Sequence, residues 1–168
     1  MKRYKEFISY IIIIVTVVLI RTFILTPVIV SGDSMKPNLI NHQLLILYKL
    51  DKNYKRFDIL VVNHDIFGQN ENVVKRLIGL PGEYIEYKDG KLYVNNEYVE
   101  EPFIDVETKD FSLAKLGYLK IPEGKYFVVG DNRNDSSDSR LFGLIEESEI
   151  KGKVKFSLFP FNRFGVIK

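Results

Sequence analysis

The hydrophobic residues of this chain are most concentrated at the N-terminus, where the run from Phe7 to Ile20 contains only two polar residues. From Tyr4 to Phe23 there are about 20 residues, and at ~1.5 Å of rise per residue a helix of that length crosses the ~30 Å hydrocarbon core of a bilayer. The pattern therefore predicts a transmembrane helix at residues 7–24, preceded by a short N-terminal segment at residues 1–6.

Positive charges flank this apolar run. Lys2, Arg3 and Lys5 precede it, and Arg21 near its far end can extend to the membrane interface. By the positive-inside rule, the N-terminus is expected in the cytoplasm and the rest of the chain outside. A cleaved signal peptide would also be apolar, but no Ala-x-Ala-like site follows, and Ile29-Val30-Ser31 is a poor substitute. A retained anchor is the preferred interpretation.

Beyond the anchor, the periodicity is that of β-strands. Short runs of apolar and β-branched residues alternate with polar, turn-forming segments, and Asp89-Gly90 is a strong hairpin signal. The expected strands are residues 44–48, 57–62, 73–80, 84–87, 92–94, 98–99, 118–121, 126–129 and 154–159. No other window shows competing helical amphipathicity. The sequence predicts a mostly β protein, with an all-β body at residues 25–168 that forms a folded sheet or partly open barrel.

One part of this body is expected to differ from the rest. Residues 83–122 are interpreted as a smaller excursion of β-ribbon and loop within the larger domain. Inside it, residues 100–117 are polar and irregular, which indicates a mobile loop or a small excursion. The sequence does not say whether that segment folds over a functional site.

Charge and cysteine content exclude several classes of function. The net charge is +2, but residues 1–24 hold four Lys or Arg against one Glu, which leaves 20 cations and 21 anions in residues 25–168. A body so close to neutral offers no basic patch for nucleic acid. The absence of cysteine removes disulfides and thiolate metal sites.

Candidate chemistry begins in the turn that follows the anchor. Gly32 permits backbone angles closed to other residues, and Pro37 restricts its own φ and the conformation of the preceding residue. The expected result is a rigid elbow that presents Ser34. Gly-Asp-Ser is also common turn chemistry, so the turn alone does not establish a nucleophile.

A serine nucleophile needs a base to take its proton. His42 and His64 lie in polar, turn-like stretches and are interpreted as solvated loop histidines. Lys75 and Arg76 interrupt an apolar strand. Because side chains along a strand point alternately to its two faces, each of these cations has apolar neighbours on its own face. Burial would lower the pKa of Lys75 and allow the neutral amine to act as a base, whereas arginine stays protonated. The alternative is an edge strand protected by charge.

A third stretch, residues 130–143, is dense in turn-forming and acidic residues. A calcium loop of the EF-hand type requires Gly at its sixth position and Glu at its twelfth, and no register here supplies both. Arg140 would also oppose a cation. No metal site is expected, and the stretch is interpreted as a cluster of buried acids and arginines that fixes loop geometry.

Together these stretches resemble the successive boxes of bacterial type I signal peptidases. The matching motifs are Ser34-Met35-x-Pro37-x-Leu39, Lys75-Arg76-x-x-Gly79-x-Pro81-Gly82, and Gly130-Asp131-Asn132 through Ser136-x-Asp138-Ser139-Arg140-x-x-Gly143. Arg56-Phe57-Asp58-Ile59 is similar to an intervening box that usually reads Arg-Gly-Asp-Ile. The resemblance covers essentially the whole chain, including the anchor. In its short length, the chain is similar to the compact Gram-positive members of the family.

The resemblance implies a role for each matching residue. Ser34 corresponds to the acylated nucleophile, Lys75 to the general base, and Ser136 to the hydroxyl that orients the lysine. The supporting residues are Met35, Pro37, Arg76, Asp131, Asp138 and Arg140. Some members carry an oxyanion-donating serine where this chain has Gly32, so the oxyanion hole is expected to rest on backbone N–H groups, that of Ser34 first.

The resemblance also implies a function. It is that of a single-pass serine endopeptidase of the cell membrane, with its catalytic domain on the outer face, that removes signal peptides from exported preproteins after small-x-small sites. Its expected partners are those preproteins, the bilayer and, by proximity, the translocation machinery, without cofactor, metal or nucleic acid. Two alternatives remain open: a specialised peptidase for pilins or conjugation proteins, and a non-catalytic, membrane-tethered β-domain.

Overall fold

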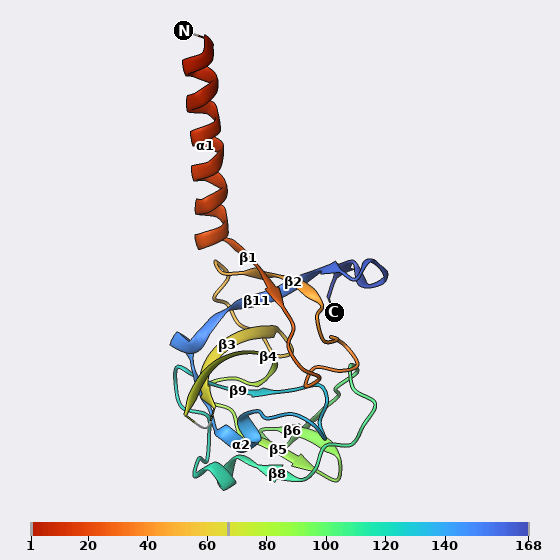
Figure 1. Ribbon diagram of the computed structural model, residues 1–168. Helices are drawn as coiled ribbons and strands as arrows, with labels where there is room; N and C mark the ends of the chain where they lie inside the picture. Colours follow the sequence, from red (N-terminus) through yellow and green to blue (C-terminus); the bar gives the residue numbers. More distant parts are fainter. Residues whose placement is uncertain (1, 67, 168) are drawn as a thin grey trace.

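A computed structural model describes residues 2–66 and 68–167. One long helix, α1 (Lys2–Phe23), projects away from a β-rich body (Figure 1). Its window Glu6–Phe23 is long and apolar enough to cross a membrane, and none of that window is buried against the body. This helix is consistent with a membrane-anchored protein. The side chains of Lys2 and Lys5, on which the predicted orientation partly rests, lie outside the described residues.

The larger sheet is antiparallel and open. Seven of its strands follow the order β1-β2-β11-β3-β4-β9-β10, and β12 pairs with β11. The strands are β1 (Leu25–Ile29), β2 (Leu44–Tyr48), β3 (Ile59–Ile66), β4 (Gln69–Gly79), β9 (Lys125–Val129), β10 (Ile145–Glu146), β11 (Ile150–Phe159) and β12 (Gly165–Val166). Within the described residues β1 and β10 do not pair, so the sheet is not a closed barrel. The prediction of a mostly β protein is confirmed.

The smaller sheet has the order β7-β6-β5-β8 and lies at the end of the body opposite α1 (Figure 1). Its strands are β5 (Ile85–Lys88), β6 (Lys91–Val94), β7 (Glu97–Val99) and β8 (Phe111–Ser112). The short helices of the body are η1 (Leu113–Leu116), α2 (Ser139–Phe142), η2 (Glu147–Glu149) and η3 (Phe161–Arg163). Buried side chains of both sheets, among them Tyr87, Phe111 and Phe127, form one hydrophobic cluster that joins them.

Several strand assignments differ from the sequence pattern: β8, β10 and β12 were not expected, and further differences concern residues 118–121 and residues 25–29. Residues 118–121 form no strand, because Ile121 exchanges hydrogen bonds only with the turn at Gly82 and Glu83. Residues 25–29 form β1, a strand that was not expected because the apolar composition of the anchor continues across the helix end. Among the described strands β1 pairs only with β2, and an edge strand of this kind accommodates Pro27.

The segment at residues 100–117 is more ordered than its composition suggests. It contains β8 and η1, and Phe111 and Leu113 are buried in the cluster between the sheets. Thr108 is also buried. This segment therefore contributes to the packed interior.

Candidate active site

Ser34 lies in a tight turn between β1 and β2. Gly32 has a φ of +83°, the conformation that glycine was expected to supply. The Lys36 N–H donates to Asp33 O at 3.0 Å, which closes the turn. Met35, an unusual residue for a solvated loop, is 1% exposed and packs into the core. The turn is thus anchored by the residue next to Ser34, while Pro37 remains exposed.

Lys75 lies in the middle of the larger sheet. Its strand β4 pairs with β3 on one side and β9 on the other, which rules out the alternative of a charged edge strand. The Lys75 side chain is only 2% exposed. Its Nζ donates to Ser34 Oγ at 2.8 Å and to Ser136 Oγ at 3.2 Å. Three residues that are distant in sequence therefore meet at one amine.

The environment of Lys75 lowers the pKa of its amine. Burial lowers its pKa from 10.5 to about 8, with Asp138 raising it and Arg140 lowering it by smaller amounts. At pH 7 a pKa of about 8 leaves roughly one amine in ten neutral, against about one in 3,000 for an exposed lysine. A neutral Nζ can accept the Ser34 hydroxyl proton, which is what a general base at a serine must do.

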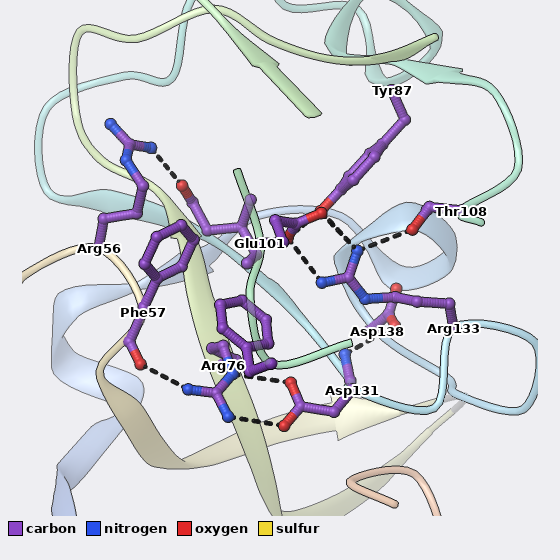
Figure 2. Close-up of polar contacts among 12 residues, drawn as sticks. Arg56, Phe57, Arg76, Tyr87, Glu101, Thr108, Asp131, Arg133 and Asp138 are labelled. Carbon is purple, nitrogen blue, oxygen red and sulfur yellow. Dashed lines mark hydrogen bonds and ion pairs between the residues drawn. The ribbon is translucent and has the colours of Figure 1, made fainter. Parts of the chain in front are cut away.

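Arg76 points to the opposite face of β4 and holds the next loop. Its Nε and NH2 donate to Asp131 Oδ1 and Oδ2, each at 2.7 Å, in a fully buried bidentate pair (Figure 2). Its NH1 donates to Phe57 O at 3.0 Å. Alternation along one strand therefore directs Lys75 to the serines and Arg76 to the loop that carries Asp131.

Asp138 and Arg140 brace the far side of this loop. Asp138 accepts from Arg140 Nε and NH2, each at 2.8 Å, and from the Gly130 N–H at 3.0 Å. Burial raises the pKa of Asp138, but the hydrogen bonds and charge of Arg140 outweigh it and the net pKa is lowered. A Cβ at Gly130 would lie 2.2 Å from Ser136 Oγ and 2.5 Å from Ser34 O, so only glycine fits here.

Comparison with known proteins shows the family of this chain. The chain matches the model of the signal peptidase family, peptidase S26, over residues 3–159. The chain belongs to that family. It is 41% identical to signal peptidase I of Bacillus licheniformis over 164 residues, covering 92% of this chain and 87% of the relative. It is 37% identical to signal peptidase IB of Staphylococcus aureus over an alignment of 180 residues, covering 95% and 93%.

A solved structure gives the same assignment. A signal peptidase I from Enterococcus faecalis superposes with a TM-score of 0.56 at 38% identity, and the match covers 60% of this chain and 96% of that chain. The chain is therefore a peptidase of the S26 family, as its motifs indicated.

The two histidines of this S26 peptidase make their hydrogen bonds to residues other than Ser34 and Lys75. His42 is exposed in a turn, as expected. The assignment of His64 to a solvated loop is wrong, because His64 lies in β3, its Nδ1 is 2.7 Å from Glu149 Oε1, and its ring packs on Phe142. The polar triplet around it had suggested a turn, but it pairs with β4 in a long hairpin. Among the described residues, no cluster of His, Asp and Glu could hold a metal.

Several residues of the site escaped the sequence reasoning. Asn132 donates from its backbone N–H to Ser34 O at 3.0 Å and from Nδ2 to Asp33 O at 3.2 Å. Asn38 donates from Nδ2 to Asp131 Oδ2 at 2.9 Å. The Gly32 N–H, a candidate oxyanion donor, instead donates to Asn41 Oδ1 at 3.1 Å. Of Asn38, Asn41 and Asn132, only Asn132 carried a signal, as part of the Gly130-Asp131-Asn132 motif.

Proposed function

We propose that this protein is a membrane-anchored serine endopeptidase that removes N-terminal signal peptides from exported preproteins with a Ser34–Lys75 dyad. The observation that carries the proposal is the 2.8 Å contact between Ser34 Oγ and a lysine amine that is 2% exposed. Desolvation keeps this amine titratable near neutral pH, and no histidine is needed as a base.

The chemistry proceeds through an acyl-enzyme. Neutral Lys75 Nζ takes the Ser34 hydroxyl proton as Oγ attacks the scissile carbonyl carbon, and the Ser34 N–H stabilises the oxyanion. The Lys75 ammonium then protonates the leaving amine as the peptide C–N bond breaks. A water molecule attacks the ester while Lys75 accepts its proton, and collapse of the tetrahedral intermediate returns that proton to Ser34 Oγ. The Ser136 hydroxyl orients Nζ throughout.

The fold provides a place for an extended substrate. A hollow of about 290 Å³ lies between β1 and β4, with walls that include Val28, Leu47 and Val61. β1, which lines this hollow, is an edge strand within the described part of the chain, and an extended peptide can pair with such an edge. We propose that the residues before the scissile bond occupy this hollow, whose walls are partly apolar and partly polar.

The anchor would bring enzyme and substrate together. We propose that α1 spans the cell membrane with residues 1–6 in the cytoplasm and residues 25–168 on the outer face as the catalytic domain. β1 begins two residues after α1 ends, so Ser34 would lie a short tether from the bilayer. Signal peptides that leave the translocation machinery would then be confined to the same membrane as the enzyme.

We expect the protein in detergent or lipid to cut a secretory preprotein directly after a small-x-small site, the specificity that its resemblance to signal peptidases implies. Intact mass of the products locates the cut. The matched control is the same preprotein with phenylalanine at the last position before the cut, which should remain uncut. Failure of the folded wild type to cut the first preprotein would contradict the proposal and favour a specialised processing peptidase or a binding domain.

A further inference from the structure

Arg133 is an almost completely buried arginine that is not part of the proposed Ser34–Lys75 dyad. Its side chain is 0% exposed, and its NH2 and NH1 donate to Glu101 Oε1 at 2.7 Å and Oε2 at 3.1 Å (Figure 2). NH1 also donates to Tyr87 OH at 3.0 Å and Thr108 Oγ1 at 2.8 Å. Burying such a pair costs desolvation that its attraction often fails to offset, so stability alone is a weak reason for it.

Asn132, the residue before Arg133, donates hydrogen bonds to the two peptide groups that flank Ser34. Asn132 Nδ2 donates to Asp33 O at 3.2 Å, and the Asn132 N–H donates to Ser34 O at 3.0 Å. Asp33 C=O and Ser34 N–H are the two ends of one planar peptide unit. A hydrogen bond that fixes the oxygen therefore also fixes the direction of the Ser34 N–H, the group that would face the oxyanion.

Asn132 is itself held from both sides. Asp131 before it is bound by Arg76, and Arg133 after it is bound by Glu101. The segment from Glu101 to Phe103 connects these two ion pairs, because the centre of the Phe103 ring lies 3.9 Å from the Arg76 guanidinium. In addition, Phe103 O accepts from Asn38 Nδ2 in the nucleophile loop at 2.7 Å.

We propose that Glu101 and Arg133 form a positioning pair that acts through Asn132 to aim the Ser34 N–H and Oγ at the scissile carbonyl. The pair connects the smaller sheet, through Tyr87 of β5, to the nucleophile turn. Oxyanion donors contribute most when they are already aimed at the developing charge, and small displacements cost large factors in rate. The inference rests on the proposed function, because it concerns how the proposed nucleophile Ser34 is oriented.

The test separates positioning from stability. In Glu101→Leu/Arg133→Met both charges are replaced by apolar side chains, so neither charge is left buried without its partner. We expect a thermal midpoint lower by a few degrees, because Tyr87 OH and Thr108 Oγ1 lose their donor. We also expect a KM within about twofold and a kcat lower by about tenfold or more, since oxyanion-hole defects act on the transition state. The pH midpoint should not move, because Lys75 keeps its surroundings. Asn132→Ala should show the same split.

The control is His64→Phe/Glu149→Leu, an acid–base pair that is partly exposed, which should keep wild-type kcat. Wild-type kcat in Glu101→Leu/Arg133→Met would overturn the inference while leaving the proposed function standing. Should that variant not fold, Glu101→Gln, which keeps the side-chain shape, replaces it with the same expected split. Absence of cleavage by the wild type would instead be a failure of the proposed function.

Discussion

Replacing Lys75 with methionine is expected to reduce signal-peptide cleavage by at least about a thousandfold, the scale on which catalytic serine–base units lose activity when one member is removed. Methionine keeps an unbranched, apolar chain of similar length but offers no basic nitrogen. Ser34 Oγ then loses the contact at 2.8 Å through which its proton would leave. Rates on a preprotein, measured beside the wild type, check this result.

The same variant should be more resistant to unfolding at neutral pH. The folded-state pKa of Lys75 is about 8, against 10.5 for the ordinary group. Between these values the unfolded chain binds more protons, so wild-type stability rises with pH across that window, by roughly 3 kcal/mol in total. The penalty is complete below pH 8 and absent above 10.5. The advantage of Lys75→Met should therefore shrink between pH 7 and 10.

Thermal unfolding of both proteins at pH 7 and pH 10 measures this difference. A gap that stays constant would show that the Lys75 ammonium carries no special desolvation cost. Cleavage retained in the methionine variant would remove Lys75 from the role of base, even if the stability prediction held.

Ser34→Ala is expected to abolish cleavage, again by at least about a thousandfold, without disturbing the fold. The turn is anchored by Met35 in the core and by backbone hydrogen bonds, none of which uses the Ser34 hydroxyl. The thermal midpoint should therefore stay within a few degrees of the wild-type value. Product masses and a melting curve provide the two readings.

A second serine of the active-site region serves as the matched control. Ser137 Oγ is buried and has no hydrogen-bond partner among the described residues. Ser137→Ala removes the same atom from the adjoining loop and should leave the cleavage rate unchanged. If Ser34→Ala cleaved the preprotein as fast as Ser137→Ala and the wild type, Ser34 would not be the nucleophile.

Local sequence patterns predicted those parts of the molecule that depend on local physics. Apolar length indicated the helix, and two-residue alternation placed Lys75 among buried neighbours. The pattern failed where tertiary pairing decided the outcome. The polar residues around His64 resembled a turn, yet they extend a β3–β4 hairpin. β1 was hidden because the membrane helix and an apolar edge strand share one composition.

The assembled site lay beyond local inference. Ser34, Lys75 and Ser136 are brought together by the sheet order, which nothing in their spacing reveals. Resemblance to a family supplied that grouping, motif by motif. The contacts of Glu101 with Arg133 fell outside the quoted motifs, since Glu101 lies in a segment that resembled an irregular loop. Only the fold shows that this segment reaches the loop behind Ser34.

The pH dependence of kcat/KM tests the central claim, a desolvated lysine as the base, most directly. The apparent pKa of kcat/KM belongs to the free enzyme, so the rate should rise about tenfold per pH unit below the pKa of Lys75 and level off above about 8. The sign follows because only the neutral amine accepts the Ser34 proton. A rise centred between about pH 6 and 7, the range of an ordinary histidine, that disappears in a His42→Ala or His64→Ala variant would contradict the account.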